Sequence, residues 1–261
     1  MTYLIFQSNP WLLPALMLVV LGLSIEIPYR CGPLLARYIP KNTDPFNAIQ
    51  AGILTLSAFV LALSFNQASA RFDTRRALVV KEADAIGTAW LRANQLGSIE
   101  SRRFRKILTD YTATRLRAYE TPGNPVLYKE TIDRGDKDQN GLWAIASSAL
   151  RAHQSNLGIS LLVQSTNDMI DTWLEQLQAL TGHVPTAVIV LTLMLVILGT
   201  LSLGMRFAID ESRPAVLSAI YVVAYVLVIN MMVDYDRPNT GFVRVSVTPL
   251  RLQLQSMQRS P

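Results

Sequence analysis

The sequence predicts an all-α membrane protein with four transmembrane helices and a helical cytoplasmic domain between the second and third. Half of the 261 residues are hydrophobic and only 16% are charged. The mean hydropathy of +0.26 is high for a soluble domain. The apolar residues form four long runs, and most charges lie between the second and third runs. Because lipid cannot hydrogen-bond an exposed backbone, such runs are expected to cross the membrane as helices.

The first two runs differ in polarity. Residues 11–27 form the first predicted span, with Trp11 as an interfacial anchor. The second span, residues 46–65, follows an Asn-Thr-Asp-Pro helix-start signal. Its polar residues are Gln50, Thr55, Ser57 and Ser64. Scattered polar residues in a spanning helix favour contact with other helices or with a water-filled path rather than lipid.

The second helix is expected to continue out of the membrane, because residues 66–95 contain one Gly and no Pro. A further helix is expected over residues 99–119. Loops are predicted at residues 121–125 and at the charged stretch 133–140, followed by one helix over residues 142–180.

The last two spans are predicted at residues 184–207 and 215–233, and a polar tail follows. Gly199 and Gly204 could let a neighbouring helix approach the third span closely. The expected organisation is therefore residues 1–66 (first two transmembrane helices), 67–183 (cytoplasmic helical domain), 184–233 (last two transmembrane helices) and 234–261 (cytoplasmic tail).

The sequence contains no recognisable catalytic set, so an enzyme is not expected. The two histidines, His153 and His183, have no further ligands at metal-site spacing. There is no phosphate-binding Gly-rich loop and no nucleophile elbow. No metal and no cofactor are expected. The net charge of +5 is attributed to membrane topology rather than to a nucleic-acid partner.

Residues 234–241 (DYDRPNTG) follow the last span and combine acidic, basic and turn-forming residues. Pro238 and Gly241 are expected to form a tight turn that ends the helix. Arg237 could pair with an acidic partner or a lipid phosphate. Asp234 and Asp236 could share a hard cation, but two carboxylates fall short of the six to eight oxygens that Ca²⁺ prefers.

Three segments resemble the bestrophin-like domain family of bacterial and plant membrane proteins. They are residues 61–76 (LALSFNQASARFDTRR), 82–89 (EADAIGTA) and 233–246 (VDYDRPNTGFVRVS). A more distant resemblance is to the bestrophin ion channels, whose second helix continues into the cytosol through an Asn, small residue, Arg-aromatic pattern. Here that pattern is Asn66, then Ala68 or Ala70, then Arg71 and Phe72. The second aromatic residue of the family pattern is replaced by Asp73, and the acidic calcium clasp is not reproduced.

The resemblance implies a homo-oligomer, usually a pentamer, with cytosolic termini and a pore narrowed by apolar residues of the second helix. Counted back from Arg71, Thr55, Phe59 and Leu63 fall at these neck positions, and Asn66 lies at the membrane edge. The basic residues near the membrane are almost evenly divided between its two sides, so they barely decide the orientation. The resemblance therefore favours an inner (plasma) membrane protein with cytoplasmic termini.

Two functional hypotheses follow. The first is an oligomeric ion channel whose partners are the bilayer, its own copies and inorganic ions. Arg71, Arg75 and Arg76 at the inner mouth would favour anions such as chloride. The alternative is a non-conducting scaffold or sensor that docks partners through its cytoplasmic helices.

Overall fold

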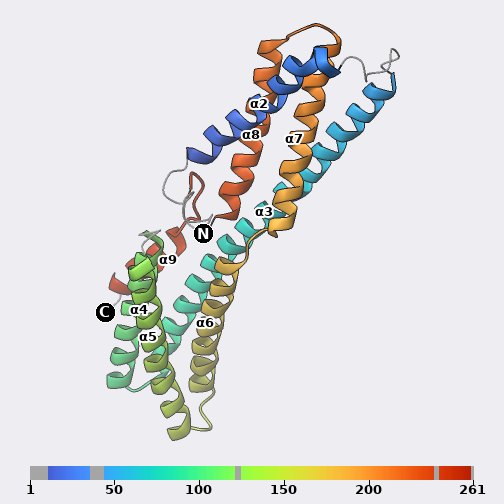
Figure 1. Ribbon diagram of the computed structural model, residues 1–261. Coiled ribbons are helices and arrows are strands. Elements are labelled where there is room, and N and C mark those ends of the chain that lie inside the picture. The colour runs from blue at the N-terminus through green and yellow to red at the C-terminus, as the bar shows by residue number, and fades with distance from the viewer. Residues whose placement is uncertain (1–10, 36–43, 121–124, 238–240, 260–261) are drawn as a thin grey trace. The chain divides into compact units, whose positions relative to one another are not determined.

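A computed structural model describes residues 11–35, 44–120, 125–237 and 241–259 (Figure 1). The described part is all-helical. Its elements are α2 (Leu12–Leu35), α3 (Asp44–Arg92), the short 3₁₀ helix η2 (Ala93–Gln95), α4 (Ser98–Glu120), α5 (Pro125–Ala152), α6 (Leu157–Thr181), α7 (Thr186–Ile209), α8 (Ala215–Asp236) and α9 (Thr248–Arg259).

The chain divides into two compact units. The membrane unit comprises Met1–Arg71 and His183–Arg237, and the insert unit comprises Phe72–Gly182 and Pro238–Pro261. The single helix α3 contributes its first part to the membrane unit and its second part to the insert unit. The expectation that the second span continues beyond the membrane as one helix is therefore confirmed.

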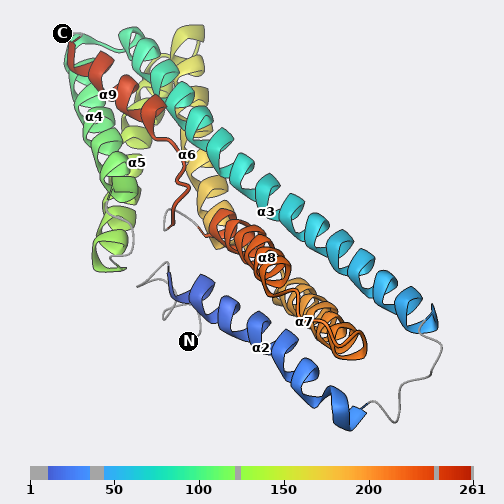
Figure 2. The same ribbon diagram turned by 90° about the horizontal axis from the view of Figure 1, so that it is seen from above.

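The membrane unit contains α2, α7, α8 and the first part of α3. Each of these helices is long and apolar enough to span a bilayer, which confirms the four predicted spans. Helix α2 packs against both α7 and α8, and α7 and α8 run alongside each other (Figure 2). The buried core of the unit is aliphatic and includes Leu21, Leu61, Val196, Val226 and Ile229.

Helices α2 and α7 approach each other closely because glycine lies at two of their contacts. A Cβ atom at Gly204 would lie 2.2 Å from the carbonyl oxygen of Ile25, and one at Gly32 would lie 2.4 Å from the Cβ of Ala208. The close approach lets Ser24 and Thr200 form a buried hydroxyl–hydroxyl hydrogen bond of 2.5 Å. The predicted role of Gly204 in helix packing is thus confirmed.

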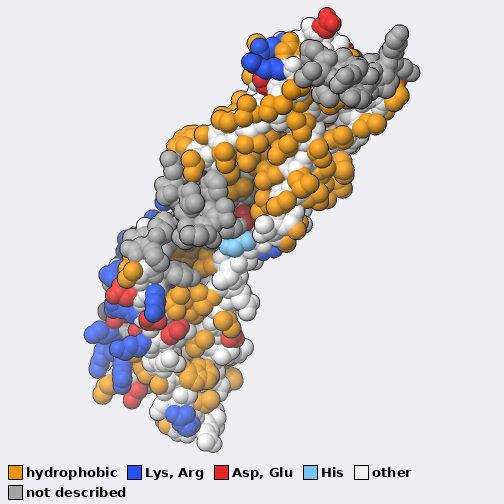
Figure 3. All heavy atoms as spheres, in the orientation of Figure 1, with side chains coloured by type: hydrophobic (Ala, Val, Ile, Leu, Met, Phe, Trp, Pro, Cys, Tyr) orange, Lys and Arg blue, Asp and Glu red, His pale blue; other side chains and the backbone are white. Residues whose placement is uncertain are grey.

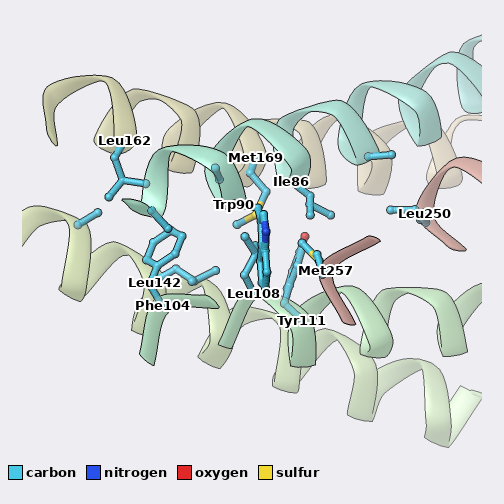
Figure 4. Close-up of a cluster of buried hydrophobic side chains, with 14 of the residues drawn as sticks. Ile86, Trp90, Phe104, Leu108, Tyr111, Leu142, Leu162, Met169, Leu250 and Met257 are labelled. Atoms are coloured by element: carbon cyan, nitrogen blue, oxygen red, sulfur yellow. The ribbon is translucent and has the colours of Figure 1, made fainter. Parts of the chain in front are cut away.

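The insert unit is a bundle of the second part of α3 with α4, α5, α6 and α9. Figure 4 shows its core, in which aromatic and aliphatic side chains from these helices interdigitate. Phe104, Leu108, Leu142 and Leu162 are fully buried there, and Leu250 and Met257 of α9 complete the core.

Two predictions for the insert are wrong. Residues 133–140 are helical, as part of α5. Four of the five charged residues of this segment are exposed and Asp138 is half-buried, whereas Thr131, Gly135, Gln139 and Leu142 are buried. Their spacing of three to four residues matches one face of a helix, so the segment is amphipathic and not a loop.

The single helix expected over residues 142–180 is in fact two helices, α5 and α6. The second begins because the Asn156 side chain accepts hydrogen bonds from the backbone N–H groups of Gly158 and Ile159, at 2.9 and 3.3 Å. This N-cap satisfies amides that otherwise lack partners in the first turn of a helix.

The structure differs from the sequence prediction at two further places, the end of α2 and the C-terminal tail. Helix α2 continues through Pro28 to Leu35, beyond the predicted end of the first span at residue 27. Membrane helices tolerate Pro because neighbouring helices and side chains satisfy the freed backbone groups. The tail, expected only as a polar segment, contains the helix α9, which is anchored by its two buried residues Leu250 and Met257.

Candidate functional site

The predicted neck residues lie together on one exposed face of α3. Thr55, Phe59, Leu63 and Asn66 are all exposed in the single chain, and the exposed fractions of Phe59 and Leu63 are 60% and 48%. Their spacing of three to four residues places them along one stripe of the helix. This neck face therefore makes no packing contribution to the core of the subunit and is available to lipid, water or another copy.

Three other polar residues of the membrane part of α3 face inward. Gln50, Ser57 and Ser64 are all buried. Ser64 forms a 2.9 Å hydrogen bond with the Thr192 hydroxyl of α7, so its polarity serves contact between helices of one subunit. The polar content of α3 therefore does not by itself indicate a water-filled path.

The three arginines predicted at the inner mouth do not share one environment. Arg76 is exposed and Arg71 is half-buried. Arg75 is only 5% exposed and lies beside Leu78, Tyr119 and Gln176 of the insert unit. The structure therefore separates Arg75 from the other two, because its side chain is directed into the bundle.

The C-terminal motif contains a buried acidic contact. Asp236, at the end of α8, accepts a 2.8 Å hydrogen bond from the Val184 backbone N–H just before α7. Its other carboxylate oxygen lies 3.3 Å from Nδ1 of His183. Asp236 therefore ties the end of α8 to the segment just before α7.

The other described residues of the C-terminal motif differ in burial and in backbone conformation. Asp234 is buried and Arg237 is half-buried at the C-cap of α8. Gly241 has a φ of 156°, a value that side chains disfavour. Pro238 lies outside the described residues, so the predicted turn is not described there. Among the residues that the structure describes, no group of three His, Cys, Asp or Glu could hold a metal ion.

We expect Asp236→Ala to lower the free energy of unfolding by about 1–3 kcal/mol, because it leaves the buried Val184 amide without its acceptor. Thermal unfolding in detergent would measure the change. Asp210→Ala is the control, since it removes a partly exposed i,i+4 ion pair with Arg206 and should cost less than about 1 kcal/mol. Equal losses in the two variants would contradict a structural role for the Asp236 contact.

A buried ion pair that the sequence analysis missed lies in the insert unit. Nε of Arg115 donates a 2.7 Å hydrogen bond to Oε1 of Glu82, and both side chains are almost completely buried. The Gln176 amide donates to the other Glu82 oxygen at 2.8 Å, and its own oxygen accepts from the Arg115 guanidinium. Trp173 stacks 3.7 Å from the guanidinium carbon. Every partner comes from a different helix than Glu82, so the network joins α3, α4 and α6.

The network also keeps two of its members, Arg115 and Tyr111, protonated. Burial opposes the charge of Arg115, but the Glu82 carboxylate together with Tyr111 and Tyr119 outweighs this effect and raises the pKa of the guanidinium. Burial, together with the charge of Glu82, raises the pKa of Tyr111 well above its ordinary value. The Tyr111 hydroxyl therefore stays protonated and can donate its 3.2 Å hydrogen bond to Glu82.

The surface of the membrane unit agrees with a lipid environment. In Figure 3, hydrophobic side chains cover most of its visible face. Its exposed apolar residues include Leu23, Leu198, Ile220 and Leu227. The fold and this surface define a multi-pass helical membrane protein with one spanning helix extended into a water-facing bundle.

The family model of the Bestrophin-like domain matches residues 37–250. The chain therefore belongs to the bestrophin-like domain family, as its sequence motifs indicated. None of the curated proteins matches the chain.

Solved structures share the fold at low sequence identity. A bacterial bestrophin homolog from Klebsiella pneumoniae is 16% identical, with a TM-score of 0.66 over 96% of each chain. A crystal structure described only as a membrane protein variant is 15% identical, with a TM-score of 0.64 over 99% of this chain and 97% of the other. The similarity extends over nearly the full length of both chains, so it includes the insert unit as well as the spans.

Proposed function

We propose that this chain is the subunit of a homo-oligomeric ion channel, in which the neck face of α3 lines a shared pore. The observation that carries the proposal is that Thr55, Phe59, Leu63 and Asn66 all point away from the core of their own subunit. Copies arranged around an axis would bring these residues into rings. Membership of a family that resembles the bestrophin channels supports the same arrangement.

Lipid could also cover an exposed apolar helix face. The polar residues at the two ends of the stripe are what favour a pore over a lipid-facing surface. Thr55 and Asn66 flank Phe59 and Leu63 on the neck face. A polar–apolar–polar sequence suits a pore in which ions meet water on both sides of a short dry constriction. The unbroken extension of α3 beyond the membrane would carry the same pore through the insert unit.

The apolar side chains give the proposed constriction its mechanism. Rings of Phe59 and Leu63 would expel water when narrow and admit it when slightly wider, which gates ions by dewetting. The resemblance to bestrophins favours a pentamer in the plasma membrane, with the termini and the insert unit in the cytoplasm. The anion preference expected from three arginines depends on Arg71 and Arg76 alone, because Arg75 is buried.

Conductance in planar bilayers tests the proposal. We expect purified protein to conduct, and Phe59→Ala to raise the current several-fold because the constriction widens and hydrates. Ile220→Ala is the matched control, since Ile220 on α8 is also 60% exposed and should affect the current little. Mass measurement of cross-linked protein in detergent would give the number of subunits.

Two results would contradict the proposal. One is the absence of current from both the wild type and Phe59→Ala over a range of salt and pH. The other is a monomer as the main species after cross-linking, because one chain cannot enclose a shared pore. An oligomer without current would instead favour the scaffold alternative.

A further inference from the structure

A groove of the membrane unit runs between α2 and α8, which pack against each other, near the end where α7 joins α8. Its volume is about 270 Å³, near the lower end of the roughly 300–1,000 Å³ of ligand pockets. Small residues keep it open: a Cβ atom at Gly22 would meet nothing within 4 Å, and Ala215 and Ala219 line it from α8. The rest of its wall is mostly apolar and includes Leu18, Ile25, Phe207, Val222 and Val223. A groove of this size and lining suits a single hydrocarbon chain.

One end of the groove is charged. The Glu26 carboxylate accepts hydrogen bonds from two guanidinium groups, at 2.7 Å from Nε of Arg30 and at 2.8 Å from Arg213. The guanidinium of Arg213 also lies over the Tyr29 ring, 5.7 Å from its centroid. Two cations share one anion, so this cluster has one positive charge in excess. The two arginine side chains are 74% and 58% exposed, so some of their five N–H donors each remain accessible to a further anion.

Two further acidic residues lie at this end of the membrane unit, at the turn between α7 and α8. Asp210 is paired with Arg206, at 2.9 Å from its Nε. Glu211 is exposed, and neither of the two acids lines the groove. The charge at the mouth of the groove is therefore that of the Glu26 cluster.

We infer that this groove binds an anionic phospholipid, with its phosphate on Arg30 and Arg213 and one acyl chain along Gly22 and Ala219. The planar fork of a guanidinium matches the oxygens of a phosphate, which it can bind through two parallel hydrogen bonds. Both oxygens of Glu26 already accept from guanidinium groups. The ammonium of a zwitterionic lipid therefore finds no free carboxylate, and a headgroup with a net negative charge is favoured.

The position of the groove along the span matches a lipid rather than a soluble anion. The span of α2 ends at Gly32, so the arginine of residue 30 lies where long basic side chains reach the headgroup region. From Tyr29 to Leu18 the groove follows α2 toward the middle of the bilayer for about 16 Å, at about 1.5 Å per residue. A soluble anion would occupy only the charged end. Lipid binding here does not require conduction, so it is independent of the proposed channel.

Native mass spectrometry of the full-length protein, with lipids added in detergent, tests the inference by counting bound lipids per subunit. The wild type is expected to retain phosphatidylglycerol several-fold better than phosphatidylethanolamine at equal concentration. Arg30→Gln/Arg213→Gln should lower the retention of phosphatidylglycerol several-fold, because the phosphate loses both cations. Arg206→Gln is the matched control, since this arginine lies at the same end of the unit but outside the Glu26 cluster.

A second pair of variants tests the apolar part of the groove and keeps every charge. Ala219→Leu places a larger side chain in the groove and should also lower the retention of phosphatidylglycerol several-fold. Ala224→Leu is its matched control, because Ala224 is likewise an exposed alanine of α8 but does not line the groove. This pair decides the inference even where the double arginine variant does not fold.

Four results would overturn the inference. Equal retention of the two lipids by the wild type excludes selection of an anionic headgroup. Equal losses in Arg206→Gln and in the double arginine variant exclude a specific role of the Glu26 cluster. Unchanged retention in Ala219→Leu excludes an acyl chain in the groove. Displacement of the lipid by inorganic phosphate alone identifies a site for a soluble anion instead. A protein that binds phosphatidylglycerol as expected but carries no current supports the lipid site and contradicts only the channel.

Discussion

Replacing Arg115 with methionine is expected to lower the free energy of unfolding of the insert unit by about 3–5 kcal/mol. The substitution leaves the Glu82 carboxylate buried without its cationic partner, which is the costly way to break a buried ion pair. Double replacement by Glu82→Gln/Arg115→Met should recover part of the loss, because no uncompensated charge then remains in the core.

Tryptophan fluorescence during denaturant unfolding suits this measurement. Three of the four tryptophans, Trp90, Trp143 and Trp173, belong to the insert unit. Lys81→Met is the control, because it breaks the exposed Lys81–Glu175 pair and should cost less than about 1 kcal/mol. If Arg115→Met were no more costly than Lys81→Met, the buried network would not stabilise the bundle as described.

Replacing Gly204 with alanine is the second large effect that we expect, at about 1–3 kcal/mol or more. The new methyl group would lie 2.2 Å from the Ile25 carbonyl oxygen, so α2 and α7 would have to separate. That separation would also stretch the Ser24–Thr200 hydrogen bond between the same helices. Loss of the folded protein on heating in detergent, followed by size-exclusion chromatography, would report the change.

Two other helix glycines provide matched controls for Gly204. A Cβ atom at Gly22 would meet nothing within 4 Å, so Gly22→Ala should be neutral or slightly stabilising. At Gly199 the nearest atom is the end of the Leu54 side chain, at 3.0 Å, which can rotate away. A Gly204→Ala protein as heat-resistant as Gly22→Ala would show that the close approach of α2 and α7 is not needed.

Two errors of the sequence analysis, at residues 133–140 and at α9, have a common cause. Residues 133–140 are charged on one side and buried on the other, but the buried positions are Thr131, Gly135 and Gln139, which carry no hydrophobic signal. The helix α9 is similarly polar apart from Leu250 and Met257. An amphipathic pattern built on small or polar residues becomes visible only when the surface that covers them is known.

In the candidate site, too, local spacing predicts some features and only tertiary contacts decide the others. The neck residues could be placed on α3 by counting along the sequence, because helical spacing is a local property. The inward direction of Ser57, Ser64 and Arg75 could not, because it depends on which side of α3 meets the other helices. The Glu82–Arg115 pair joins residues 33 positions apart, a pairing that no local pattern indicates.

The sequence by itself determined the membrane class, the four spans, the long second helix and the family. These properties follow from the apolar content of successive segments and from contiguous motifs, which need no knowledge of distant neighbours. Only the tertiary structure decided which face of α3 is left exposed, how α2 and α7 meet at Gly204, and what Asp236 and Glu82 bind. Each of these depends on contacts between residues far apart in the chain, and folding alone brings such residues together.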